Sequence, residues 1–323
     1  MINEPTLFIL GAGASAPYGF PTAKELKEDI IKNTSKRYFA LKNLPANNYI
    51  QMYENRDTDY FNNFADYFTG FTSDSIDLFL ATHEELVNLG KEAIVLALSE
   101  KEMDLVRNPR KTDWVEYLYS NFIISGISGN RKEDFEKFKQ NKVSFITFNY
   151  ERSLEFLFWN MLSHFHGKMS REEIYDLFKT IKIHHIYGDL GQLVTENGIW
   201  EGGMPLGGAL HLEDLPKATK NIKTIYERRN HPKKDEVSKL FDEAKMIVFL
   251  GFGFAQENLD ILFDCGFKPQ GKHFLSTSFG IRYEIPRRIK STPEIFRKHF
   301  LMNWKGEEEL RCKDLLEKYY LSS

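Results

Sequence analysis

Five short apolar runs, each bounded by polar or glycine-containing sequence, are the strongest constraint on the fold of this 323-residue chain. The runs are continuously apolar, which is typical of strands that are buried on both faces of a parallel sheet. Helical patterns separate them, as the crossover connections of a parallel sheet require. The predicted strands are Thr6–Leu10, Val143–Phe148, Ile181–Tyr187, Met246–Leu250 and His273–Ser276.

The spacing of these runs is uneven. More than a hundred residues separate the first two, and an amphipathic helix that opens at Ser75-Ile-Asp-Leu-Phe-Leu lies between them. We therefore expect a single domain over 1–323 that carries a helical insertion at about 35–140. A stretch at 191–235, which contains EGGMPLGG, could form a lid or loop. We expect a C-terminal helical segment at about 291–323.

Composition excludes several classes of protein. Lys plus Arg (43) nearly balances Asp plus Glu (46), so the net charge of −3 leaves no basic footprint, and we expect no direct nucleic-acid binding. The two cysteines, Cys265 and Cys312, have no near neighbours, which disfavours a disulfide framework and a cysteine-ligated zinc site. The first residues do not resemble a signal peptide, and no apolar run approaches the ~18 residues that span a bilayer. We therefore expect a cytoplasmic protein with no membrane contact.

A glycine-rich turn, Gly11-Ala-Gly-Ala-Ser15, follows the first predicted strand, and Thr22–Glu25 reads as a capping box that opens a helix. Glycine lets a backbone turn sharply and approach a ligand closely, with free amides aimed at a phosphate. A strand, a glycine turn and a helix in that order favour an α/β fold of the Rossmann-like kind. We expect a mostly parallel sheet with helices on both faces. A tight connection without a ligand is the alternative.

The dehydrogenase fingerprint fits this turn less well. PYGFP separates the glycines from the helix, and Asp29 falls inside that helix instead of at the end of a second strand. Hydride transfer is therefore disfavoured.

Two further motifs place polar residues at strand ends. Asn149 follows the second predicted strand in FITFNYE, where it is either a ligand-binding residue or the cap of a turn or helix. His185 and Tyr187, in IKIHHIYGDLG, are two residues apart and are predicted to share one face of the third strand, with His184 on the other. Each histidine could instead be structural.

These motifs, in this order, resemble those of the sirtuin-like superfamily, in particular its bacterial antiphage-defence branch. The family opens on Gly-Ala-Gly-Ala-Ser followed by Gly-x-Pro-Thr, here at 11–15 and 19–22. A Thr-x-Asn-x-Asp pattern stands here as Thr147 to Glu151, with Glu for the final Asp. The family's catalytic His usually precedes Gly directly, whereas here the form is His185-x-Tyr-Gly, as in bacterial sirtuin-like NADases. SIDLFL resembles a helix start of the defence branch.

The resemblance implies a set of site residues. Asn149 and His185 would be catalytic, with Asn149 ordering the nicotinamide ribose and a water and His185 acting as base. IVFLGFGFAQENLDIL and HFLSTS resemble the late strands where the family holds the adenosine half of NAD. The implied NAD-binding residues are Gly11, Ala12, Gly13, Ala14, Ser15, Pro21, Thr22, Thr147, Tyr187, Gly251, Phe252, Gly253, Asn258, Ser276 and Thr277.

The resemblance also implies an activity. Deacylases of this superfamily carry two Cys pairs in a zinc module, which this chain lacks, and an Arg where this chain has Lys24. We therefore expect hydrolysis of NAD to nicotinamide and ADP-ribose. A protein deacylase, an ADP-ribosyltransferase and a non-catalytic NAD-binding subunit are the alternatives.

Control of this activity and the absence of a metal are further expectations. An effector that depletes NAD must be gated, by homo-oligomerisation or by a partner such as a HerA-type ATPase or a short Argonaute. No metal is expected, since His164-Phe-His166 has no third ligand near it in sequence.

Overall fold

A five-stranded parallel sheet organises the protein in the computed structural model, which describes residues 1–43, 59–109, 112–125, 127, 132–165, 169–191, 206–207, 210–225, 227, 234–303 and 309–320. The order of the strands is β3-β2-β1-β4-β5. Their bounds are β1 Thr6–Leu10, β2 Val143–Thr147, β3 Lys182–His185, β4 Met246–Leu250 and β5 His273–Ser276. The five predicted strands are confirmed, with β2 one residue shorter and β3 three residues shorter than expected.

The central strands are buried as their sequences predict. Every residue of β1 and β4 is buried, and Phe8 of β1 stacks on Phe145 of β2 with ring centroids 5.2 Å apart. β1 pairs with β2 on one side and with β4 on the other, in register from Thr6 onward. The direction of strand order therefore reverses at β1, the position where open α/β sheets bind ligands outside the carboxyl ends of their strands.

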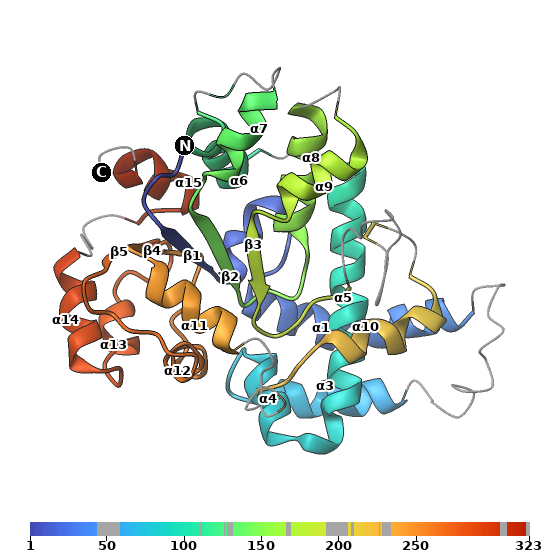
Figure 1. Ribbon diagram of the computed structural model, residues 1–323. Helices are drawn as coiled ribbons and strands as arrows, with labels where there is room; N and C mark the ends of the chain where they lie inside the picture. The colour runs from blue at the N-terminus through green and yellow to red at the C-terminus, as the bar shows by residue number, and fades with distance from the viewer. Residues whose placement is uncertain are drawn as a thin grey trace.

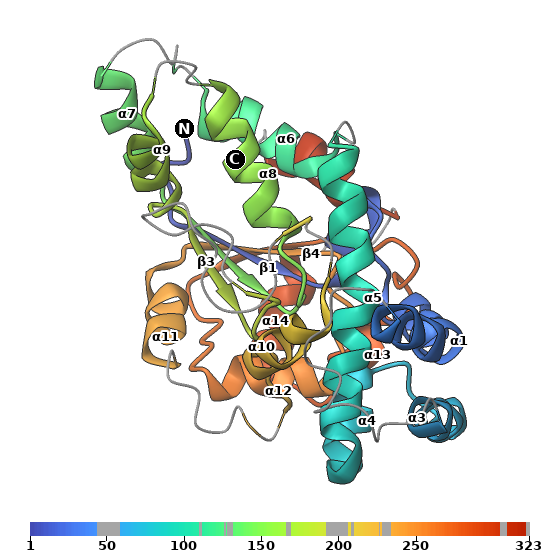
Figure 2. The ribbon, with the colours of Figure 1, turned by 90° about the vertical axis from the view of Figure 1, so that its right-hand side faces the viewer.

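Helices cover both faces of the sheet, which confirms the predicted α/β class. In Figure 2, α8 lies on one side of the sheet and α11 and α12 lie on the other. The bounds of the α-helices are α1 Ala23–Lys42, α3 Asp59–Gly70, α4 Ile76–Thr82, α5 Val87–Arg107, α6 Trp114–Leu118, α7 Lys132–Lys139, α8 Ser153–Phe165, α9 Arg171–Phe178, α10 Leu215–Asn221, α11 Lys234–Glu243, α12 Gln256–Asp264, α13 Ile285–Arg288, α14 Glu294–Asn303 and α15 Cys312–Leu315.

A helical group lies beyond the carboxyl ends of the strands. α1 packs against α3 and α5, and the arrowheads of β2 and β3 in Figure 1 point toward this group. α1 continues to Lys42, across the boundary expected near residue 35, so the first helix of the sheet is also part of the helical group. Most of α5 from Gly90 to Ser99 is buried, which makes this helix the centre of the group.

The predicted capping signals form. Thr22 and Glu25 make the capping box that starts α1, and the Ser75 hydroxyl accepts from the amide of Leu78 at the start of α4. The C-terminal segment is helical where it is described, and its α14 packs Phe296 and Phe300 against Phe274 of β5. Most of the stretch 191–235 that could form a lid lies outside the described residues, with α10 in the part that is described. No described helix is long and apolar enough to cross a bilayer.

Candidate functional site

A pocket lies at the carboxyl ends of β1, β2 and β3 and brings together three of the motifs singled out in the sequence. The pocket is small in the ligand-free protein: its interior has room for about one water molecule, so a larger ligand requires it to open. The polar lining comes from the glycine turn, from the loop after β2 and from the end of β3. The lining residues are Leu10, Ala14, Ser15, Tyr18, Trp114, Val115, Thr147, Asn149, Glu151, Ser153, Leu154 and His185.

The glycine turn packs against a second turn, the one that follows β4. The amide of Gly11 donates to the Leu250 carbonyl and that of Gly13 to the Gly251 carbonyl, both at 3.0 Å. A Cβ on Gly11 would lie 2.6 Å from the Gly251 oxygen. Gly251 itself has φ +56, and a Cβ there would lie 2.0 Å from the amide nitrogen of Ala14. The glycines of both turns therefore let two backbones touch where the strand order reverses.

Four of the five amides of this turn are already engaged. Besides Gly11 and Gly13, the amides of Ala14 and Ser15 donate to the carbonyls of Gly11 and Ala12, within the short helical turn Ala12–Ala14. The expectation of free amides aimed at a phosphate is therefore wrong for these four groups in the ligand-free protein. The physical reason is that a buried amide must have a partner, and the carbonyls of the neighbouring turn and of this one supply it.

Helix α6 closes the far side of the glycine turn. The Trp114 indole donates to the Ala14 carbonyl at 2.7 Å, and the Tyr18 hydroxyl donates to Glu116 while accepting from the amide of Val115, both at 2.9 Å. Burial, followed by the nearby Glu116 carboxylate, raises the pKa of Tyr18 well above its ordinary value. The sequence analysis did not find these residues, because about a hundred positions separate Trp114 from the turn it contacts.

Asn149 lines the pocket from the loop after β2. Nδ2 of its side chain lies 3.2 Å from each of three acceptors, the Gly11 carbonyl, the Ser15 hydroxyl and Glu151, and shares its two hydrogens among them. Its backbone amide donates to the Thr147 hydroxyl at 3.1 Å, which turns the chain at the end of β2. The predicted residues Ser15, Thr147 and Asn149 therefore form one hydrogen-bonded group.

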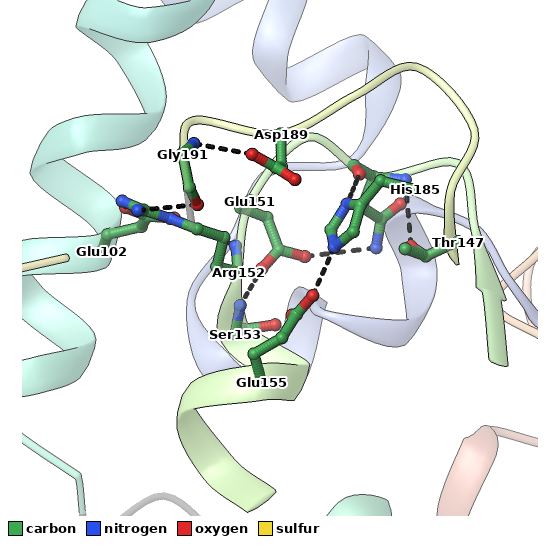
Figure 3. Close-up of polar contacts among 10 residues, drawn as sticks. Glu102, Thr147, Glu151, Arg152, Ser153, Glu155, His185, Asp189 and Gly191 are labelled. Carbon is green, nitrogen blue, oxygen red and sulfur yellow. Dashed lines mark hydrogen bonds and ion pairs between the residues drawn. The ribbon is translucent and has the colours of Figure 1, made fainter. Parts of the chain in front are cut away.

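His185 joins this group through its ring. Nδ1 donates to the backbone carbonyl of Asn149 at 2.8 Å, and Nε2 lies 2.5 Å from Oε1 of Glu155 on the first turn of α8 (Figure 3). Burial alone would lower the pKa of His185, but the Glu155 carboxylate outweighs burial and raises that pKa to about 10. The sequence analysis missed Glu155. Its position, six residues after Asn149 and in the first turn of a helix, was an available signal.

A second carboxylate, Glu151, stands where the sirtuin-like pattern has Asp. It is buried, accepts from Asn149 at 3.2 Å and accepts from the amide of Ser153 at 2.6 Å. Burial raises the pKa of Glu151. Glu151 therefore places a second carboxylate at the pocket, held by the start of α8.

Arg152 ties three segments together behind the pocket. Its guanidinium pairs with Glu102 of α5, with Nη2 and Oε2 2.5 Å apart, and its Nη1 donates to the Gly191 carbonyl at 3.1 Å. Arg152 and Glu102 are buried, with side-chain exposures of 1% and 0%. Figure 3 shows this pair beside Asp189, which accepts from the Gly191 amide at 2.7 Å. The pair joins the helical group to the loops that carry Asn149 and His185.

The predicted shared orientation of His185 and Tyr187 is wrong. Strand β3 ends at His185, so the alternation of side chains stops there. The Tyr187 hydroxyl donates to Asn258 of α12 at 2.7 Å, while the His185 ring contacts α8. His184 lies on the opposite face from His185, as expected, with Nδ1 3.8 Å from Glu236 of α11.

Other predicted residues lie outside the pocket lining. The Thr277 hydroxyl accepts from the amide of Gly251 at 2.8 Å, and Gly253 accepts from Arg288 at 2.5 Å. These contacts hold the turn after β4 in shape. The predicted NAD-binding residues that do not line the pocket are Gly11, Ala12, Gly13, Pro21, Thr22, Tyr187, Gly251, Phe252, Gly253, Asn258, Ser276 and Thr277.

Within the described part of the chain, no group of three or more His, Cys, Asp and Glu side chains could hold a metal ion. His166, the second residue of the His164-Phe-His166 pair, lies outside the described residues.

Comparison with known proteins gives no assignment. No protein-family model matches the chain, and no curated protein matches its sequence.

Proposed function

We propose that this protein cleaves NAD at the bond between nicotinamide and ribose and transfers the ADP-ribose to water. One observation carries the proposal: Asn149 and His185, at the carboxyl ends of adjacent strands, are joined by the 2.8 Å bond between the His185 ring and the Asn149 carbonyl and line one pocket with the glycine turn. Open α/β sheets bind nucleotides at this edge. The resemblance of the motifs to those of the sirtuin-like superfamily is the reason for proposing NAD as the substrate.

The polar lining suits the ribose end of such a substrate. Amide, hydroxyl and carboxylate groups from Ser15, Asn149, Glu151 and Ser153 can bind ribose hydroxyls and a water. The engaged amides of the glycine turn leave the pyrophosphate without these donors, so its binding requires either a rearrangement of the turn or other groups. The residues therefore fit the reacting end of NAD better than its phosphates.

The proposed reaction requires a correctly oriented ribose and water and a general base, and it does not require a strong acid to protonate the leaving group. Nicotinamide leaves as a neutral molecule from a positively charged precursor, through an oxocarbenium-like state. Asn149 would orient the ribose and the attacking water. His185 would take a proton from that water, directly or through a ribose hydroxyl that is reprotonated by the water, and the water oxygen would bond to the ribose carbon as nicotinamide departs. Glu151 would hold Asn149 in place.

The experiment is incubation of the purified full chain with NAD and separation of the products by chromatography. Nicotinamide and ADP-ribose are expected without any acylated peptide. Asn149→Ala and His185→Ala are expected to reduce the rate by at least about 100-fold, the scale for loss of a positioning group or a base. Strict dependence on an acylated peptide would favour a deacylase instead.

A non-catalytic NAD-binding subunit is the second candidate. The observation that favours it is that both ring nitrogens of His185 are engaged by oxygen atoms, which leaves no basic nitrogen in the ligand-free protein. Calorimetric titration that detects NAD binding, together with an absence of products, would support this candidate. Gating by self-assembly or by a partner protein, which the family resemblance implies, is a further proposal. It would be tested by assaying activity against protein concentration.

A further inference from the structure

His185 has two hydrogen-bond partners, and neither of them can donate a hydrogen when the Glu155 carboxyl is ionised. The Asn149 carbonyl lies 2.8 Å from Nδ1, and a carboxylate oxygen of Glu155 lies 2.5 Å from Nε2. The ring satisfies both contacts when both of its nitrogens carry hydrogen. In this arrangement His185 is an imidazolium ion, and its side chain is only 7% exposed.

The charges around the ring favour that state. Glu155 faces it from α8, Asp189 from the loop after β3, and Glu151 lies beside Glu155 in the loop after β2. The nearby cation, Arg152, is paired with Glu102. Burial lowers the pKa of His185, but the Glu155 carboxylate and then Asp189 outweigh burial, which is the physical reason that this pKa is raised to about 10.

A base needs a nitrogen with a free lone pair, so one of the two contacts must break before His185 can act. Nδ1 is held by the main chain of Asn149, the residue that the proposed reaction also requires in place. Nε2 is held by a side chain, which can move without disturbing the strand. The Oε2 atom of Glu155 is buried and has no hydrogen-bond partner among the described residues. Glu155 can therefore take up a new contact when the ring is released.

We propose that Glu155 is the positioning residue of this site, and that it holds Nε2 of His185 in the ligand-free protein and must release that nitrogen before His185 can accept a proton. This inference rests on the proposed function for the role of His185. On release, the ring gives its Nε2 proton to solvent water, which leaves a neutral imidazole with a free lone pair on Nε2. The freed Nε2 then takes a proton from water or a ribose hydroxyl, whose oxygen keeps the electron pair.

The first test uses the ligand-free full chain and does not depend on NAD. His185 is titrated by NMR, with its signal assigned from the His185→Gln variant. We expect the pKa to lie near 10 in the parent protein and to fall well below that value in Glu155→Gln, since that change removes the charge, keeps the shape and leaves the burial that lowers the pKa. The matched control is Glu236→Gln, which alters the carboxylate beside His184 on the other face of β3 and is expected to leave His185 unchanged. Titration of His185 near 6.5 in the parent protein overturns the proposal.

The second test is the pH profile of NAD cleavage. The rate in the parent protein is expected to rise with pH toward about 10, while Glu155→Gln moves this rise to lower pH and Glu155→Asp keeps it at high pH. A purely structural role for Glu155 would lower the rate equally at every pH, and that result overturns the proposal. An absence of cleavage by the parent protein at every pH overturns the proposed function and the base role of His185. The NMR titration still decides whether Glu155 holds the ring.

Discussion

The amide of Gly13 donates to the carbonyl of Gly251 at 3.0 Å, so the two glycine-rich turns of this protein contact each other through their backbones. Gly13 has no positive φ, and space, not backbone conformation, excludes a side chain there. A Cβ on Gly13 would lie 2.9 Å from the Cα and 3.0 Å from the oxygen of Gly251. A cluster of glycines after a strand thus has a structural reason that is independent of any ligand.

Gly13→Ala is therefore expected to destabilise the protein by about 1–3 kcal/mol, the usual cost of overpacking, since the atoms in contact are backbone and cannot rotate away. Denaturant unfolding measures this loss. Gly70→Ala, at the end of α3 where a Cβ meets nothing within 4 Å, is the control and should unfold like the parent protein. If Gly13→Ala is as stable as the parent protein, the close contact between the two turns does not contribute to stability.

The sequence predicted the sheet well because each strand is a local apolar run. Three of the five strands have the predicted bounds. β3 is shorter because it lies at the edge of the sheet, where Lys182 is exposed and the two histidines are half-buried. The end of an edge strand depends on neighbouring elements, which a single-sequence pattern does not contain.

The sequence predicted only those residues of the candidate site that belong to local patterns. Asn149 and His185 stand at strand ends and could be found from local patterns. Glu102 and Trp114 contact the site from helices that lie 50 and 100 residues away along the chain from their partners. Their positions follow from tertiary packing. The hydrogen bonds of the Gly11 and Gly13 amides likewise depend on the end of β4, which lies more than 230 residues after β1 in the sequence.

The buried Arg152–Glu102 pair provides a second prediction. Glu102→Gln leaves the buried guanidinium without its counter-charge, and breaking such a pair typically costs about 3–5 kcal/mol. Replacing both residues by methionine is expected to restore part of that stability, because two apolar side chains need no partner, whereas the Arg152 backbone amide and the Gly191 carbonyl lose theirs. NAD cleavage should stay low in the double variant, since the loops that carry Asn149 and His185 lose their common anchor. Full activity of the double variant would show that the pair has no positioning role.

The His185–Glu155 pair provides a third prediction, on stability against pH. The pKa of His185 is raised from 6.5 to about 10 on folding, so the folded protein binds the proton more tightly than the unfolded chain does. The stability from this pair is complete below pH 6.5 and is lost as the pH rises from 6.5 through about 10. The expected loss is a few kcal/mol, measured by denaturant unfolding at pH 6, 8 and 10 as the difference between the parent and His185→Gln. A difference that does not change with pH would contradict the ion pair.

The last prediction separates the roles of the three residues at the end of β3. The Tyr187 hydroxyl bonds Asn258 at 2.7 Å and lies outside the pocket lining, so Tyr187→Phe is expected to lose about 1 kcal/mol of stability and to keep most of the NAD-cleaving activity. His184→Gln is expected to keep that activity too, because His184 faces Glu236 on the other side of the sheet. His185→Gln should lose it, since only this ring reaches Asn149. Rates with NAD and melting curves for the three variants, measured side by side, test this assignment. Loss of activity in Tyr187→Phe without loss of stability would place the tyrosine hydroxyl at the reacting end of the substrate, and His185 and Tyr187 would then both act in the reaction.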